Sequence, residues 1–155
     1  EKLEEYISSV LKIDQFEIIE TEQGIIPMTD YPFHKLNTKY VTKIGTAGGW
    51  VKASSGYSFK NTEAKLDILI ENIKSGLKPS ANLFSKKFQF YDAIFLEVLE
   101  KRNDLGESIF TKFYTKNSIQ DNFKFMDEET SFSEEIKIMF SLYHPQFIKS
   151  FFSKL

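Results

Sequence analysis

The chain has 155 residues, the size of a single domain with one sizeable core. Its 20 basic and 22 acidic side chains are mixed along the sequence and leave a net charge of -2, so nucleic acid is not expected as a partner. Cysteine is absent and His34 and His144 are the only histidines, which excludes disulfides and a cysteine nucleophile and predicts no metal site.

The start of the sequence shows neither a membrane span nor a signal peptide. No apolar run approaches the roughly 20 residues that cross a bilayer, and the first residues, EKLEEY, are charged. We therefore expect a cytoplasmic chain, soluble or attached at most to a membrane surface. The chain begins without Met and inside a helical pattern, which favours the C-terminal part of a longer protein.

The first third of the chain combines one helix with strand-like segments. Residues 1–12 have apolar side chains at helical spacing. Residues 15–28 are typical of two short strands around Gly24, paired as a hairpin, with Pro27 confining its strand to an edge. A loop follows, and the β-branched residues 40–44 predict another strand.

From residue 55 onward, apolar residues recur every three or four positions, as they do in amphipathic helices. The pattern predicts helices over residues 55–74, 82–102, 107–114 and 131–143 and from Pro145 onward. Gly76 ends the first, and Ser131 with Glu134 forms a capping box before the fourth. The prediction is an α+β fold, mostly helical, with one region over residues 1–60 and a C-terminal helical region over residues 61–155.

Residues 44–59, IGTAGGWVKASSGYSF, hold four of the seven glycines and the only tryptophan. Such small residues allow sharp turns and close approach of a backbone or a ligand. The stretch lies between the predicted strand and a helix that Ser54 or Ser55 could cap, where backbone N–H groups favour an anion or a ring carbonyl. A phosphate-bearing or flavin-like cofactor fits there, and a purely structural turn is the alternative. Neither the P-loop pattern nor G-x-G-x-x-G is present.

The 16 phenylalanines and 7 tyrosines fill a core or, alternatively, line a slot for a long apolar ligand. Classical catalytic patterns are sparse. The carboxylates at 127–129 are typical of a solvated loop, and His34 is a candidate general base or a structural loop residue. His144 is interpreted as the residue at the start of the last helix. No G-x-S-x-G element is present.

Three segments together resemble the C-terminal half of FAD-dependent carotenoid cyclases, the lycopene cyclase family. They are GIIPM, the loop with YPF, and IGTAGGWVKASSGYSF; farther on, FQFYDAIFLEVL and IFTKFY are similar to that family's aromatic helices in the same order. The resemblance covers about residues 24–152. The chain departs from the family pattern at Lys52, usually His, at Ala53, usually Pro, and at Gly45 and Thr46, where many related flavoproteins have Gly-Asp.

The resemblance implies a fragment of a Rossmann-type FAD flavoprotein whose Rossmann segment and acidic catalytic segment lie upstream of Glu1. It implies reduced FAD with NADPH as reductant, although this chain alone is not expected to bind FAD tightly or to be active alone. The activity implied is redox-neutral cyclisation of the ends of lycopene to β-ionone rings, with possible peripheral membrane contact because lycopene is dissolved in membranes.

The same resemblance assigns candidate site residues. The flavin contacts it implies are Gly45, Thr46, Ala47, Gly48, Gly49, Ser55, Gly56 and Tyr57, and the substrate contacts are Trp50, Tyr31 and Phe33. Two other functions stay open at this point. One is a related flavoprotein reductase or hydroxylase of isoprenoids, and the other is a helical interaction module without chemistry.

Overall fold

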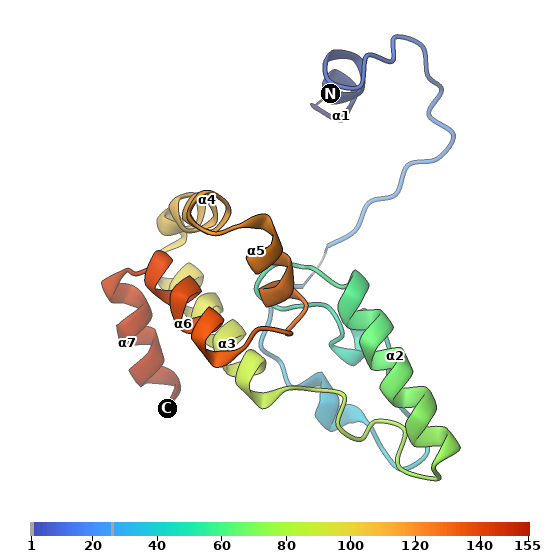
Figure 1. Ribbon diagram of the computed structural model, residues 1–155. Helices are drawn as coiled ribbons and strands as arrows, with labels where there is room; N and C mark the ends of the chain where they lie inside the picture. The colour runs from blue at the N-terminus through green and yellow to red at the C-terminus, as the bar shows by residue number, and fades with distance from the viewer. Residues whose placement is uncertain (1, 26) are drawn as a thin grey trace.

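The computed structural model describes residues 2–25 and 27–155, and this part of the chain consists of helices and irregular segments (Figure 1). The α-helices are α1 (Lys2–Ser9), α2 (Phe59–Lys74), α3 (Lys86–Lys101), α4 (Gly106–Lys116), α5 (Ile119–Met126), α6 (Phe132–Ser141) and α7 (Pro145–Lys154). Short 3-10 turns are η1 (Phe33–Leu36), η2 (Thr46–Gly48) and η3 (Asn103–Leu105).

The prediction of an α+β fold is wrong for the described residues, which contain no strand. The hairpin expected over residues 15–28 is an extended segment, of which residue 26 lies outside the described residues, and residues 40–44 are irregular too. A strand needs a neighbour for its backbone hydrogen bonds and an apolar surface for one face. Ile19 and Ile25 are 94% and 95% exposed, so their side chains are not packed against an apolar surface.

The helix predicted over residues 1–12 is shorter in the structure, where α1 has no buried residue and lies apart from the other helices (Figure 1). An extended segment connects it to the rest of the chain. Asp30, near the end of that segment, forms a salt bridge with Lys154 of α7, with 2.9 Å between Asp30 Oδ2 and Lys154 Nζ. Helix α1 therefore contributes no buried side chain to the helical part of the chain. No helix among the described residues is long and apolar enough to cross a membrane.

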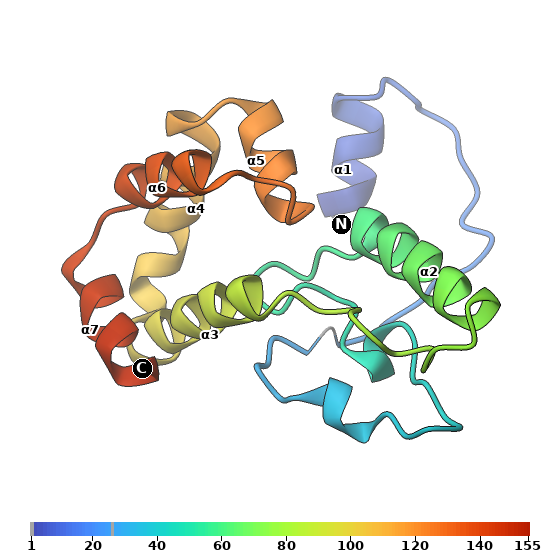
Figure 2. The same ribbon diagram turned by 60° about the horizontal axis from the view of Figure 1, so that its bottom comes forward.

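The C-terminal helices form the main packed unit (Figure 2). Helix α3 packs along α7, and α4 packs against α5 and α6. Phe113, Met126 and Ile138 are buried together where α4, α5 and α6 meet, and Tyr57 of the glycine stretch packs against them. Burial of apolar area at this junction holds the glycine stretch against the helices.

Buried asparagines join segments that apolar packing alone would not orient. The Asn122 amide donates to the Phe113 carbonyl at 3.0 Å, which connects α5 to α4. The Asn61 amide of α2 donates to the Met126 carbonyl at 3.3 Å, and Asn72 donates to Ala81 at 2.8 Å. Each of these hydrogen bonds satisfies a backbone carbonyl. Each one also links two segments of the chain to one another.

Most helix boundaries follow the predicted signals. Gly76 has φ +69° just after α2, His144 Nδ1 accepts from the Gln146 N–H at 3.1 Å at the start of α7, and Pro145 is the first residue of that helix. The capping box of Ser131 and Glu134 is confirmed at α6. Helix α5 was not predicted, although Ser118 caps it by accepting from the Asp121 N–H. At eight residues, its apolar repeat is too short to stand out.

The capping box predicts a pH dependence. Glu134 accepts hydrogen bonds from Lys124 Nζ at 2.6 Å and from the Ser131 N–H and hydroxyl, both at 2.7 Å, and these contacts lower its pKa to about 2. Since the unfolded pKa is about 4.3, the stabilisation is complete above that pH and is lost as pH falls toward 2. We expect Glu134→Gln to remove this part of the acid sensitivity in urea midpoints measured against pH. Glu129→Gln, in the exposed loop before α6, should keep the wild-type pH dependence.

Candidate functional site

The glycine stretch forms a closed turn, which we call the glycine loop (residues 44–59). The Gly48 N–H donates to the Ile44 and Gly45 carbonyls at 3.1 and 3.0 Å, and the Gly49 N–H donates to Thr46 at 3.0 Å. The Trp50 N–H donates to the Gly45 carbonyl at 3.0 Å. These three N–H groups are therefore satisfied inside the loop.

Two positions in the loop require glycine for different reasons. A Cβ at Gly48 would lie 2.3 Å from the Lys43 carbonyl oxygen and 2.7 Å from its carbon. Gly49 has φ +72° and faces Phe33, whose Cβ would lie 3.0 Å from an added Cβ. The backbone is thus in close contact with the chain before it and with the η1 turn.

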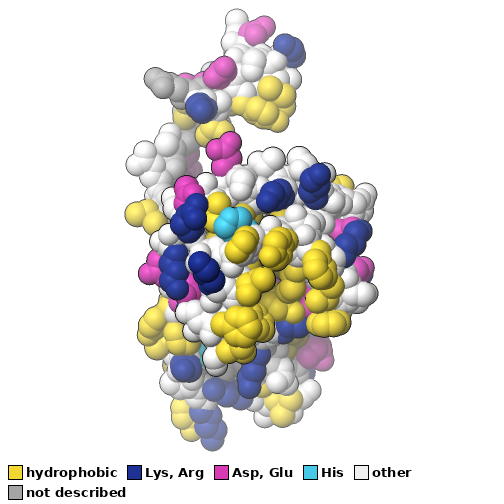
Figure 3. All heavy atoms as spheres, turned by 90° about the vertical axis from the view of Figure 1, so that its left-hand side faces the viewer, with side chains coloured by type: hydrophobic (Ala, Val, Ile, Leu, Met, Phe, Trp, Pro, Cys, Tyr) yellow, Lys and Arg dark blue, Asp and Glu magenta, His cyan; other side chains and the backbone are white. Residues whose placement is uncertain are grey.

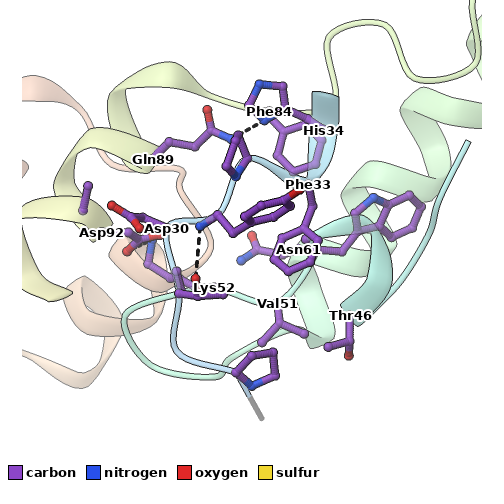
Figure 4. Close-up of a pocket in the computed structure, with 18 of the residues that line it drawn as sticks. Asp30, Phe33, His34, Thr46, Val51, Lys52, Asn61, Phe84, Gln89 and Asp92 are labelled. Carbon is purple, nitrogen blue, oxygen red and sulfur yellow. Dashed lines mark hydrogen bonds and ion pairs between the residues drawn. The ribbon is translucent and has the colours of Figure 1, made fainter. Parts of the chain in front are cut away.

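Beside this loop lies a cavity of about 190 Å³, which we call the loop cavity (Figure 4). Its walls come from η1, the glycine loop, α2 and the start of α3, and its polar lining includes His34, Lys52, Asn61, Lys65, Gln89 and Asp92. Figure 4 shows His34, Lys52, Asn61, Gln89 and Asp92 converging from separate segments, with His34 Nδ1 3.5 Å from Gln89 Nε2. Among the described residues, the Trp50 Nε1–H at this wall has no hydrogen-bond partner.

An enclosed ion pair lies at the floor of the loop cavity. The Lys52 side chain is 2% exposed, and its ammonium lies 3.1 and 3.3 Å from the two Asp92 carboxylate oxygens and 3.6 Å from Glu128. The rings of Phe88 and Phe125 lie 5.3 and 5.8 Å from the same ammonium. Pairing and ring faces together replace the water that this cation has lost.

A second buried cation lines the loop cavity. Lys65 of α2 is buried, its ammonium lies 5.6 Å from the Phe84 ring centre, and burial lowers its pKa despite the Glu128 charge. Glu128 therefore faces two lysines. The sequence predicts a solvated loop for the carboxylates at 127–129. In the structure, Glu129 is the one of these three that is exposed.

A larger apolar groove lies on the other side of the ion pair. The aromatic groove has a volume of about 550 Å³, and α3, α4, α5, α6 and α7 all contribute to it. Phe95 lies at its wall with ring centres of Phe110 and Phe147 at 5.6 and 6.3 Å. Lys52 and Asp92 line both the groove and the loop cavity, so the ion pair forms part of the wall between them.

Figure 3 views the molecule from the side of Figure 1 on which α4, α6 and α7 lie. Hydrophobic side chains gather in the middle of this face, with basic and acidic side chains around them. Exposed groove residues on this part of the chain include Phe132, Phe140 and Tyr143. The aromatic groove is thus open to solvent on an apolar face.

One polar cluster lies directly in the groove wall. The Tyr91 hydroxyl donates to Glu135 Oε2 at 2.9 Å, and Lys87 Nζ donates to Glu135 Oε1 at 2.5 Å. The Glu135 side chain is fully buried. Burial and the Glu135 carboxylate raise the pKa of Tyr91 to about 12, so the phenol is protonated at neutral pH.

The structure separates the residues predicted to bind cofactor from one another. Thr46 and Gly49 line the loop cavity, Ser55 lines the groove, and Tyr57 packs in the helical junction. Neither cavity is lined by Gly45, Ala47, Gly48 or Gly56. The residues predicted to contact substrate stay together, because Trp50, Tyr31 and Phe33 all line the loop cavity.

Comparison with known families decides what kind of protein carries these two cavities. A family model described as lycopene cyclase protein matches residues 1–152. The chain belongs to the lycopene cyclase family. The matched residues include the glycine loop and the helices that line the aromatic groove. No curated protein and no solved structure matches the chain.

Family membership raises the question whether the described residues fit a flavin, and they do not form a flavin site by themselves. The glycine-loop N–H groups of Gly48, Gly49 and Trp50 already donate within the loop. The loop cavity of about 190 Å³ is smaller than the roughly 300–1,000 Å³ of most small-molecule sites. Ser54 and Ser55, the predicted caps, do not cap α2 either. The residue at the N-cap position is Ser58, and its side chain makes no capping hydrogen bond.

The sequence analysis did not identify the charged residues that are buried around the two cavities of this lycopene cyclase family chain. Lys52 was noted only as a departure from the family pattern, and Asp92 and Glu135 lie within helices among many other charged residues. A weak signal was present at Asp92, which interrupts the aromatic run FQFYDAIF. A carboxylate inside such a run needs a partner, but nothing in the spacing identifies Lys52, 40 residues away.

The close packing at Gly48 gives a direct test of the turn. We expect Gly48→Ala to lower the free energy of unfolding by about 1–3 kcal/mol, because the added Cβ overlaps backbone atoms of Lys43. Gly24→Ala is the matched control, since no atom lies within 4 Å of its added Cβ. Urea denaturation of both variants measures the difference. Equal midpoints for the two would show that the turn does not need glycine at 48.

The ion pair gives a second test. Lys52→Met leaves the Asp92 carboxylate buried and without its main partner, which costs about 3–5 kcal/mol. We expect the double variant with Asp92→Leu to regain most of that loss. Lys60→Met, which breaks the exposed pair with Glu63, should change stability much less than Lys52→Met does. A Lys52→Met variant as stable as Lys60→Met would contradict the buried pair.

Proposed function

We propose that this chain is the part of a lycopene β-cyclase that holds one end of the substrate in the aromatic groove. The observation that carries the proposal is the aromatic groove itself, in a chain that belongs to the lycopene cyclase family. Its volume of about 550 Å³ lies in the range of small-molecule sites. Its lining is almost entirely apolar, as a hydrocarbon polyene without polar groups requires.

The reaction would place specific demands on this groove. Ring closure begins with protonation of an alkene, passes through a carbocation and ends with loss of a proton, so oxidation state is unchanged. The carbocation needs negative or π-electron density nearby and exclusion of water. Phe95, Phe110 and Phe113 supply ring faces at the groove wall. The proposal assigns no catalytic acid among the residues of this chain.

Reduced FAD, with NADPH as its reductant, is part of the proposal because the family resemblance implies it. When bound, the reduced flavin would supply negative charge. Since the described residues do not form a flavin site alone, we derive no step through it. The Trp50 Nε1–H, unpartnered among the described residues, is one donor that the loop cavity could offer to a ring carbonyl.

Peripheral contact with a membrane also belongs to this proposal. Lycopene is dissolved in the bilayer, and the groove opens on an apolar face with charged side chains of both signs around it (Figure 3). Such an apolar face suits contact with a membrane surface.

Product analysis tests the function. The full-length protein is expressed in cells that accumulate lycopene. The extracted pigments are separated by chromatography, and their molecular masses are measured by mass spectrometry. We expect lycopene to become β-carotene with unchanged mass. Added hydrogen would instead indicate a reductase, and added oxygen a hydroxylase. Unchanged lycopene with folded protein would contradict the cyclase proposal.

A pair of leucine substitutions tests the groove. Phe95→Leu keeps an apolar side chain but removes a ring face, worth about 1–2 kcal/mol toward a cation, so we expect cyclisation about 5- to 30-fold slower per folded protein. Phe152→Leu is the control, because Phe152 is 70% exposed on α7 and does not line the groove. Equal cyclisation rates for the two variants would show that the groove takes no part in the reaction.

A further inference from the structure

This inference rests on the proposed function and concerns its last step. A ring cation that has closed must lose one proton, and the carbon that loses it decides where the ring double bond lies. A nearby base selects that carbon, whereas a groove with only hydrocarbon walls does not. The question is therefore which basic atom lies in the wall of the aromatic groove.

Two polar clusters in the described residues meet this requirement at first sight. One is Asp92 with Lys52, and the other is Tyr91 with Glu135. Both Asp92 oxygens face the Lys52 ammonium at 3.1 and 3.3 Å, and that ammonium is almost fully enclosed. A proton taken up by Asp92 would have to leave through this enclosed pair.

The second cluster reaches from the groove to solvent. Tyr91 lines the groove, its hydroxyl donates to the fully buried Glu135, and the other Glu135 oxygen accepts from Lys87. The Lys87 side chain is 44% exposed. Thr130 donates to the same carboxylate at 3.4 Å. Hydrogen bonds therefore run without interruption from a groove-lining phenol to a side chain in contact with water.

We propose that Tyr91 is the catalytic residue that takes the proton from the cyclised cation and that Glu135, acting through it, is a positioning residue that receives the proton of the phenol. One C–H bond of the ring breaks, and its electron pair forms the ring double bond. The proton moves to the Tyr91 oxygen as the phenolic proton moves to Glu135 Oε2. Lys87 then releases one of its protons to water and takes up the proton of Glu135, which restores the carboxylate. No oxidant or reductant is consumed.

The protonation state of the cluster suits this role. A phenol has one donor and two acceptor lone pairs, so Tyr91 can donate to Glu135 and still present a lone pair to the groove. The raised pKa keeps the phenol protonated at neutral pH, which excludes a standing phenolate in the apolar groove. A neutral phenol next to a carboxylate is a sufficient base, because a carbocation is an extremely strong acid.

The experiment measures ring isomers rather than rate alone. Full-length wild type, Tyr91→Phe, Glu135→Gln and the control Tyr114→Phe are expressed in lycopene-accumulating cells, and the positions of the ring double bonds are determined by NMR. Tyr114 is another phenol of the groove lining. Urea midpoints confirm that each variant is folded.

We expect Tyr91→Phe and Glu135→Gln to lower the ratio of the wild-type ring isomer to other isomers about tenfold or more, since a placed base contributes on the order of 10²-fold to a proton transfer. Tyr114→Phe should keep the wild-type ratio. Folded Tyr91→Phe protein with the wild-type ratio would overturn the inference while leaving the cyclase function intact. Wild-type protein that forms no rings would overturn the proposed function itself.

Discussion

The buried ion pair of Lys52 and Asp92 is the contact on which the arrangement of the molecule depends. A charge removed from water must be paired at short range, and Lys52 finds Asp92, Glu128 and two ring faces around its ammonium. Because Lys52 belongs to the glycine loop and Asp92 to α3, this pairing fixes the loop against the helical unit. It also makes the wall that separates the loop cavity from the aromatic groove.

The two cavities divide the chemistry that a lycopene cyclase family chain must support. The loop cavity is polar and small, with buried lysines and carboxylates that balance one another. The aromatic groove is apolar and larger, and it opens on a hydrophobic face. A proton can cross its wall only where a polar side chain interrupts the rings. The hydrogen-bonded series from Tyr91 through Glu135 to Lys87 is such a place, which is why a fully buried carboxylate there has functional interest beyond packing.

The helices could be predicted from the sequence because their signals are local. Gly76, Ser131 and Pro145 act within one turn of the backbone, and the apolar repeats of α2, α3 and α6 continue for ten residues or more. The strands could not be judged in the same way, since β-branched residues form a strand only beside a partner. Residues 15–28 and 40–44 have the right composition, yet they form no strand with any described segment. Ser54 and Ser55 fail as caps because the loop turns once more before α2 begins.

The sequence by itself determined the family, the helical C-terminal region and the glycine-rich turn, since each depends on residues that are close together in the chain. It also showed that aromatic side chains are numerous enough for a slot. Only the tertiary structure decided which of them line the groove, that Tyr31, Phe33 and Trp50 lie at the other cavity, and that Lys52 meets Asp92 and Tyr91 meets Glu135. The physical reason is that burial and charge pairing join residues 40 or more positions apart, and no local pattern encodes such a partner.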